Sequence, residues 1–321
     1  MYRIAVESGG SEPIRQRGGG AMITLKQIEA LYWIAELGSF DAAALRLSTT
    51  QSAISKRIQE LESRFDLVIF DRTRRAAVLT PKGEEILQSA RQLLNMRDGL
   101  LVQLGAKDAM FRRLRLGVTE LTALTWLPIL VDRLRERFPQ LEIVPEVGLG
   151  HMLYERLADH TIDLIIVPDV FHDPRFFTLP VGTVRNAWMY AEGVMPAKRT
   201  FALTEIAQQT LIVQGKDSGM GIAYGQWFRA HGIETPKTVV CSNLLAQIGL
   251  TVSGLGVSFL PKDCLSHLID HGALRSANTT PALPKIQYAA MYLPTQQVDF
   301  LGEVARLCHT CCDFSRLVLQ V

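Results

Sequence analysis

The stretch from Ser39 to Glu62, SFDAAALRLSTTQSAISKRIQELE, constrains the fold of this chain more than any other. It predicts two short helices joined by a tight polar turn. Ser39 is a natural N-cap for the first helix and Thr50 for the second, because a side-chain oxygen at that position bonds an otherwise unpaired N–H of the first turn. Gly38 can end a further helix upstream. Three helices in this order, two of them joined by a short turn, indicate a helix-turn-helix unit.

The two helices are expected to pack through different surfaces. The first presents a small and apolar face that allows close approach, formed by Ala42, Ala43, Leu45 and Leu47. The second carries one apolar stripe at helical spacing, formed by Ile54, Ile58, Leu61 and Phe65.

The other face of the second helix carries hydrogen-bonding groups and cations. Glutamine can bond adenine edges bidentately, Lys and Arg reach guanine or phosphate, and serine adapts to several partners. An ordinary amphipathic surface helix would have a similar polar face, so this helix alone leaves both interpretations open. As a DNA-reading helix, its candidate contacts are Thr50, Gln51, Ser52, Ser55, Lys56, Arg57 and Gln59.

Two short apolar runs follow, over residues 67–70 and 76–79, and flank the sequence DRTRR. This pattern predicts a β-hairpin wing whose tip arginines, Arg72, Arg74 and Arg75, can contact the phosphate backbone. Residues 46–75 hold seven Lys or Arg against four Asp or Glu, so this window is +3 while the rest of the chain is −1. A local basic patch is what DNA binding requires, although the whole chain is only +2.

Residues 22 to about 107 resemble the DNA-binding half of a LysR-type transcriptional regulator. An ordered set of residues supports this resemblance: Gly38-Ser39-Phe40, Ala42-Ala43-Ala44, Leu47-Ser48, Gln51-Ser52-Ala53-Ile54-Ser55, Ile58, Leu61-Glu62, Phe70-Asp71-Arg72 and Leu79-Thr80-Pro81-x-Gly83. It implies a sequence-specific regulator with a winged helix-turn-helix over residues 22–80 that binds double-stranded promoter DNA. It also implies a homodimer, with homotetramers common, and leaves RNA polymerase open as a further partner.

The segment before this domain differs from it in composition and in hydrophobic pattern. Residues 1–21 contain glycine pairs and triplets and lack apolar periodicity, so we expect a disordered extension, with Met22 as the start that the family pattern would use. Thr24 and Gln27 then predict a capping box, with Ile23 and Ile28 as its hydrophobic staple.

A long helix is predicted over residues 81–112, opened by Pro81 at its first position. Its apolar positions recur in alternating steps of four and three, which predicts a coiled-coil seam: Ile86, Ala90, Leu93, Leu100 and Leu104, with Arg97 interrupting. A helix packed on its own domain is the alternative. A dimer suits DNA recognition better, because two half-domains read a palindrome.

From Arg113 onward strands and helices alternate, which predicts an α/β domain over residues 113–321. A helix is expected over residues 122–137, and the apolar run at 163–167 indicates a buried strand of a parallel sheet. Two such sets predict two lobes, one over about 113–181 and 285–321 and the other over about 182–284. This layout resembles the effector-binding domain of the same family, itself similar to periplasmic binding proteins; the most specific match is Gly249-Leu250-x-x-Ser253-Gly254-Leu255-Gly256-Val257-x-x-Leu260-Pro261.

In an open α/β sheet, ligands gather at the carboxyl ends of strands near helix N-termini. Three such places occur, and the resemblance implies that a small-molecule effector binds between the lobes at the matching loops. A plain helix cap is the alternative for each of them. Glu120 repels an anion unless it is paired, so a neutral, amine-bearing or hydroxyl-rich effector stays open. The candidate effector contacts are Thr119, Glu120, Leu121, Thr122, Ser218, Ser242 and Asn243.

The sequence lacks the motifs that are typical of several other classes of protein. The five cysteines give no disulfide framework, and Cys308-His309-Thr310-Cys311-Cys312 lacks a second ligand pair for zinc, so we expect no metal and no cofactor. An enzyme on the α/β part is the alternative function, but no phosphate loop, G-x-S-x-G or HExxH motif assigns a catalytic residue. Without a charge-free transmembrane stretch or a signal-peptide core, we expect a cytoplasmic protein with no membrane partner, not an exported solute-binding component.

Overall fold

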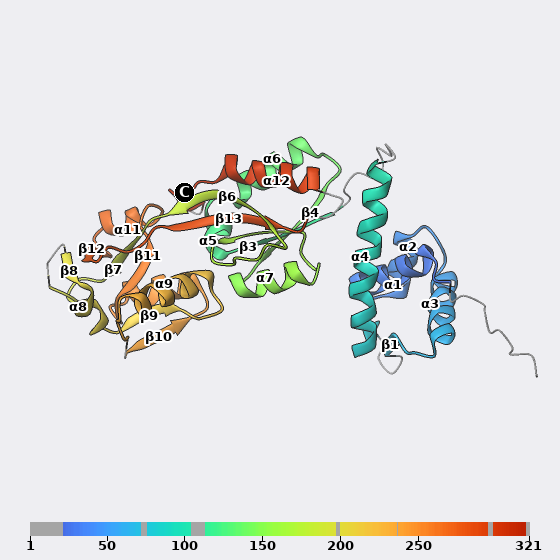
Figure 1. Ribbon diagram of the computed structural model, residues 1–321, viewed down its shortest axis with the longest axis horizontal. Coiled ribbons are helices and arrows are strands. Elements are labelled where there is room, and N and C mark those ends of the chain that lie inside the picture. Colours follow the sequence, from blue (N-terminus) through green and yellow to red (C-terminus); the bar gives the residue numbers. More distant parts are fainter. Residues whose placement is uncertain are drawn as a thin grey trace, which may run out of the picture. The chain divides into compact units, whose positions relative to one another are not determined.

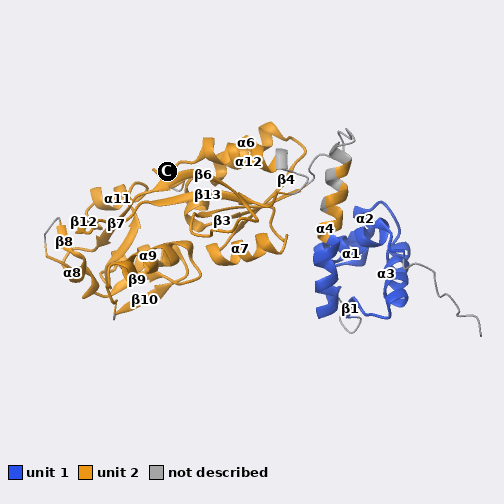
Figure 2. Cartoon of the chain, viewed as in Figure 1, with its two compact units in different colours: residues 1–90 blue, residues 91–321 orange. Residues whose placement is uncertain are grey.

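The computed structural model describes residues 22–71, 76–103, 113–196, 200–235, 237–294 and 298–318. The chain divides into two compact units, residues 1–90 and 91–321 (Figure 2). The division falls inside the long helix α4 (Pro81–Gln103), which contributes to both units. The predicted extension over residues 1–21, the wing arginines Arg72, Arg74 and Arg75, and Leu104 of the predicted seam lie outside the described residues.

The first unit begins with three helices, α1 (Leu25–Leu37), α2 (Phe40–Arg46) and α3 (Gln51–Phe65). Their predicted N-caps are all confirmed. Thr24 and Gln27 form a capping box, Ser39 Oγ accepts from Ala42 N at 3.4 Å, and Thr50 Oγ1 accepts from Ala53 N at 3.2 Å. Gly38 ends α1 in the left-handed region, at φ +65°, where a side chain would be strained.

The helices pack as predicted, with two exceptions. Ile54, Ile58 and Leu61 form the buried stripe of α3, but Phe65, its last residue, is partly exposed because the chain turns away at Asp66 with φ 50°. In α2 the buried residues are Ala43 and Ala44, whereas the expected packing residue Leu45 is 82% exposed. The small alanines let α2 approach α1 and α3 closely, and Leu45, one step further round the helix, faces solvent.

The predicted hairpin is present as two short antiparallel strands, β1 (Phe70–Asp71) and β2 (Val78–Leu79). A buried carboxylate of α3 holds it, because Glu62 Oε1 accepts from Ile69 N at 2.8 Å and from Phe70 N at 3.3 Å. Directly after β2, Thr80 Oγ1 donates to Val68 O at 2.7 Å and accepts from Gly83 N at 3.0 Å. The hairpin is therefore tied both to α3 and to the start of α4.

The second unit contains two lobes, the first built on a five-stranded sheet. Its strands lie in the order β4 (Glu142–Val147), β3 (Arg113–Val118), β5 (Leu164–Pro168), β13 (Ile286–Tyr292) and β6 (Phe177–Val184). The first three run parallel, while β13 is antiparallel to both of its neighbours. Helices α6 (Leu127–Arg137) and α12 (Val298–Cys311) cover one face and α7 (Gly150–Ala158) the other (Figure 1).

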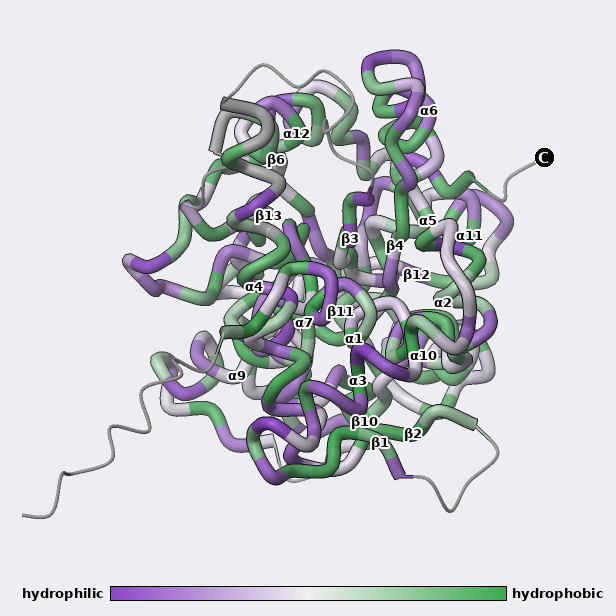
Figure 3. The backbone as a smooth tube through the Cα atoms, turned by 90° about the vertical axis from the view of Figure 1, so that its right-hand side faces the viewer, coloured by the Kyte–Doolittle hydropathy of each residue, from purple (hydrophilic) through white to green (hydrophobic). Residues whose placement is uncertain are grey.

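The helix expected over residues 122–137 is two helices. A short α5 (Glu120–Thr125) ends at Trp126, and α6 starts at Leu127. Pro128 lies in the first turn of α6, and it cannot continue a helix because it lacks an N–H and its ring clashes with the carbonyl four residues earlier. Hydrophobic and hydrophilic residues both occur along α6 (Figure 3), and its buried residues are Leu130 and Leu134, one turn apart.

The second lobe contains a four-stranded sheet and a strand pair. The sheet order is β11 (Ser258–Pro261), β7 (Asn186–Tyr190), β12 (Arg275–Thr280) and β8 (Thr200–Ala202). The parallel pair is β9 (Leu211–Gln214) and β10 (Thr238–Cys241), joined to the sheet region by a bridge between Leu211 and Val257. Its helices are α8 (Leu203–Ala207), α9 (Gly219–Ala230), α10 (Leu244–Val252) and α11 (Ser266–Asp270). The chain passes between the lobes from β6 to β7 and again from β12 to β13.

The five cysteines are all free, and four of them are buried. Burial raises the pKa of the Cys312 thiol to about 12 and also raises the pKa of Cys308. These thiols therefore stay protonated and act as packing groups within and directly after α12 (Val298–Cys311). Among the described residues, no group of three or more His, Cys, Asp or Glu could hold a metal ion. Within the same residues, every helix is too short or too polar to span a membrane.

Candidate functional site

The polar residues of α3 lie on one outward face, opposite Ile54, Ile58 and Leu61. Gln51 Nε2 donates to Ser55 Oγ at 3.2 Å, which orients the amide along the helix. Lys56 is exposed and lies 4.0 Å from Glu60, so its ammonium group is free to move to another anion. The candidate residues on this face are exposed or half-buried: Thr50, Gln51, Ser52, Ser55, Lys56, Arg57 and Gln59.

A hollow of about 320 Å³ lies between this face and the hairpin. Gln51, Ser55 and Gln59 line it from α3, and Asp71 and Ala77 line it from the hairpin. The hairpin is therefore beside the helix that carries the polar side chains. A protruding helix can enter the major groove while an adjacent hairpin contacts the backbone.

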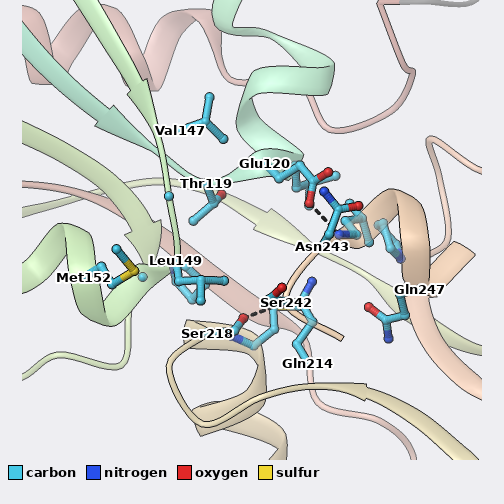
Figure 4. Close-up of a pocket in the computed structure, with 18 of the residues that line it drawn as sticks. Thr119, Glu120, Val147, Leu149, Met152, Gln214, Ser218, Ser242, Asn243 and Gln247 are labelled. Atoms are coloured by element: carbon cyan, nitrogen blue, oxygen red, sulfur yellow. Dashed lines mark hydrogen bonds between the residues drawn. The ribbon is translucent and has the colours of Figure 1, made fainter. Parts of the chain in front are cut away.

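The second unit contains a cavity of about 410 Å³ between its lobes, within the usual size range of small-molecule sites (Figure 4). It lies where several strands end and helices begin, as predicted. It is lined from the first lobe by the start of α5, the turn before α7 and the end of β5. From the second lobe it receives the starts of α9 and α10. Six of the seven predicted effector contacts line it: Thr119, Glu120, Leu121, Ser218, Ser242 and Asn243.

Thr122 is the exception, since it is fully buried and does not line the cavity. Its hydroxyl lies 3.4 Å from that of Thr119. On the first turn of α5 the side chain at position 122 points into the lobe, whereas residues 119–121 meet the cavity. Thr122 is therefore placed to orient Thr119 and not to line the cavity.

Several lining residues were missed from the sequence. Gln214 ends β9, so the same strand-end rule could have found it. Met152, Gln247, Phe259 and Tyr288 come from the interiors of helices and strands, and no local pattern distinguishes them from core residues. Their convergence depends on long-range pairing, such as that of β13 with β5 and β6.

Hydrogen bonds hold the polar lining in place. Ser218 Oγ donates to Gln214 Oε1 and accepts from Met220 N, so it caps α9. Asn243 Oδ1 accepts from Ala246 N at 2.9 Å and caps α10. Thr119 Oγ1 donates to the Tyr288 hydroxyl at 3.5 Å, and burial raises the pKa of Tyr288 to about 12, which keeps that hydroxyl neutral.

Two hydrogen bonds join the lobes beside the cavity. Glu120 Oε2, from α5, accepts from Leu244 N at the start of α10 at 2.5 Å, and Figure 4 shows Glu120 next to Asn243 there. His151 N, from α7, donates to Asp217 O at 3.0 Å. Gly150 and Gly219 also meet closely, since a Cβ on Gly150 would lie 3.0 Å from Gly219 N. These contacts describe a cleft whose walls touch at its edges.

A winged helix-turn-helix joined by a long helix to a two-lobed α/β domain with an interlobe cavity defines a DNA-binding regulator with a ligand-binding domain. Family models agree for both parts. Residues 25–84 match the bacterial regulatory helix-turn-helix protein, lysR family, and residues 108–304, more than half of the chain, match the LysR substrate binding domain. The chain therefore belongs to the LysR family of transcriptional regulators. Its members are regulators, which sets aside the enzyme alternative.

Individual relatives are distant. The transcriptional regulator CzcR of Bacillus anthracis is 23% identical over 77% of this chain and 83% of its own length. CbbR of Rhizobium meliloti is 28% identical over 78% and 81%. Full-length OxyR of Pseudomonas aeruginosa matches with a TM-score of 0.72 at 23% identity, over 92% of this chain and all of that one. CbnR in complex with its target DNA matches with a TM-score of 0.57 at 19% identity, over 89% and 99%. At these identities the two structures support the fold alone.

Proposed function

We propose that α3 reads promoter DNA in the major groove, with Gln51, Ser52, Ser55 and Lys56 making the principal base contacts. The observation that carries this proposal is the single outward polar face of α3, backed by a buried apolar stripe and flanked by the hairpin. CbnR, which has a similar fold, has been solved in complex with its target DNA. Arg72, Arg74 and Arg75 of the wing would contribute phosphate contacts that carry no sequence information.

The interlobe cavity is proposed as the effector site. It has the size of a small metabolite site and mixes hydroxyl, amide and apolar groups contributed by both lobes. A ligand there contacts both walls, so it can bias the angle between the lobes through contacts that differ between open and closed states. In a dimer or tetramer that angle would set the spacing of the DNA-binding domains and so the bending of DNA.

The protein would act in the bacterial cytoplasm as a homodimer or homotetramer, because the DNA is there and a palindromic site needs two recognition helices. The exposed apolar residues of α4, Leu93, Met96 and Leu100, support dimerisation through this helix. We propose domain boundaries at residues 80 and 112, and the end of β2 at Leu79 and the start of β3 at Arg113 support them.

The DNA-binding role is tested by replacing Gln51 with Ala and measuring fluorescence anisotropy on a duplex selected from a random library. Loss of a bidentate contact should cost about 1–3 kcal/mol of binding free energy and relax specificity at one base position. Ser63→Ala, on the last turns of the same helix, is the matched control and should bind as wild type. Equal binding of Gln51→Ala and wild type to every duplex would contradict the assignment.

The wing arginines should act through phosphate. Arg74→Ala should weaken binding to all sequences alike and reduce the slope of log affinity against log salt concentration by about one unit. A change in sequence preference without a change in the salt slope would contradict this division between helix and wing.

A further inference from the structure

We infer that the interlobe cavity selects a small ligand that carries a protonated amine, with Glu120 as its counter-ion. This inference rests on the proposed function of the cavity as the effector site and names the chemical class of the effector. It is carried by the charge of the lining and by the occupation of the N-termini of α9 and α10, which an anion could otherwise use.

The lining is nearly free of charge. Of its twenty residues, all of them in the described part of the chain, Glu120 alone bears a formal charge at neutral pH. None is Lys, Arg or His. Lys262 adjoins the lining residue Pro261 in the sequence, and Lys216 lies two positions from Gln214 and Ser218, but neither lysine lines the cavity. Asp217, next to Lys216, opposes its charge. An anionic ligand would therefore be desolvated beside a carboxylate with no cation in the lining to offset the cost.

Two of the helix N-termini at the cavity, those of α9 and α10, are already in use, whereas Thr119 and Leu149 make no side-chain cap hydrogen bond at the starts of α5 and α7. At the start of α10, Leu244 N donates to Glu120 and Ala246 N donates to Asn243. At the start of α9, Met220 N donates to Ser218. The carboxylate of Glu120 thus occupies the position beside α10 that a ligand carboxylate would take. A ligand anion could bind there only by displacing it.

Glu120 keeps the capacity to bind a cation while it bridges the lobes. A carboxylate has two oxygens with about four lone-pair directions, and the bond to Leu244 N uses one of them. The hydroxyls of Thr119 and Ser242 add acceptors. The cavity of about 410 Å³ has the size of a small-molecule site.

The inference predicts an order of affinity among ligands of equal length. Full-length protein would be titrated by calorimetry with α,ω-diamines of three to five carbons, from 1,3-diaminopropane through putrescine to cadaverine. The dicarboxylates and diols of the same lengths serve as matched probes. At least one diamine should bind, and more tightly than its diol, while the dicarboxylates should not bind.

Glu120→Gln separates the charge from the hydrogen bond, because the amide oxygen can still accept from Leu244 N. It should lower diamine affinity by about tenfold or more and leave diol affinity unchanged. Glu136→Gln, the same replacement on the exposed surface of α6, should bind diamines as wild type does.

Tighter binding of a dicarboxylate, unchanged diamine affinity in Glu120→Gln, or failure of every diamine to bind would each overturn the inference. The variants Thr119→Val and Ser242→Ala distinguish failure of this inference from failure of the proposed function of the cavity. A dicarboxylate whose binding those variants weaken would leave the cavity as the effector site and overturn only the assigned charge. A ligand that binds equally to wild type and to all the cavity variants would overturn the site as well.

Discussion

At the scale of single residues, the hairpin depends on Glu62, Thr80 and Gly83, three positions of the family pattern. Glu62 is buried and accepts two backbone N–H groups that would otherwise be unpaired. Thr80 joins the hairpin to α4 through its hydroxyl. Gly83 lets α4 approach the hairpin, because a Cβ there would lie 2.3 Å from Ile69 O. These residue types provide close contacts with the backbone within the DNA-binding unit.

Gly83→Ala should therefore destabilise the DNA-binding unit. The added methyl group would meet a backbone oxygen, which cannot rotate away, so the helix or hairpin must shift at a cost of about 1–3 kcal/mol. Urea denaturation followed by circular dichroism measures the loss. Gln88→Ala, at an exposed position of the same helix, is the control and should change stability by less than about 0.5 kcal/mol. Equal stability of the two variants would show that α4 does not pack on Ile69 this closely.

The two threonines at the start of α5 should behave differently. Thr119 lines the cavity, so Thr119→Val should lose about 1 kcal/mol of effector affinity if its hydroxyl bonds the ligand. Thr122→Val should keep that affinity within a few tenths of a kcal/mol, since the buried Thr122 does not reach the cavity. Calorimetry with the ligand found in the screen measures both. A larger loss for Thr122→Val than for Thr119→Val would reverse the assignment.

Tyr288 predicts a dependence of stability on alkaline pH. Burial raises its pKa to about 12 in the folded chain, above the usual value of about 10 in an unfolded chain. The folded state therefore holds this proton more tightly, and the associated stability is complete below pH 10 and is lost as pH rises to 12. Two pKa units correspond to at most about 3 kcal/mol. Urea midpoints between pH 10 and 12 should fall less steeply for Tyr288→Phe than for wild type; equal slopes would contradict the prediction.

How far the sequence predicts such residues depends on whether their environment is local. The caps Thr24, Ser39 and Thr50 were predictable because each acts on its own first turn. Thr119 and Ser242 were predictable because strand ends and helix starts can be located in a sequence. Tyr288 and Phe259 were not, since strand pairing brings them to the cavity from distant segments.

At the scale of elements, α4 carries two apolar stripes with separate roles. Leu87, Ala90 and Leu94 are buried, whereas Leu93 is 45% and Leu100 50% exposed. The predicted seam mixed the two, because Ala90 belongs to the buried stripe. A helix that packs inward on one side and exposes leucines on the other can hold its own unit and a second copy at once. The sequence offered two interpretations of this helix, a dimer seam and a helix packed on its own domain, and the two are therefore compatible.

Leu93→Lys should dissociate the dimer while leaving the fold of each chain intact. In a seam, each lysine would be desolvated near its mate, at a cost of several kcal/mol per dimer. Gln92→Lys, at the neighbouring exposed position, adds the same charge outside the seam and should stay dimeric. Sedimentation velocity distinguishes the two. A Leu93→Lys variant that sediments as wild type would place the oligomer interface elsewhere.

At the scale of the whole molecule, a DNA-binding unit and a ligand-binding unit lie on one chain, and the cavity lies where the two lobes meet. The lobes are linked by two chain crossings, by contacts such as Glu120 to Leu244 and by a hydrophobic core that includes buried residues of both lobes. A ligand that touches both walls can bias their relative angle through contacts that differ between open and closed states. A ligand should then change the bending of the bound DNA more than the affinity of the protein for DNA.

DNase I footprinting of wild-type protein on its selected duplex, with and without the bound amine, tests this account most directly. The ligand should change the length of the protected region or its hypersensitive positions in wild type. In Thr119→Val, which retains the DNA-binding unit, that response should require a higher ligand concentration. Footprints that are identical with and without saturating ligand would contradict the account, as would a response of Thr119→Val at the wild-type concentration.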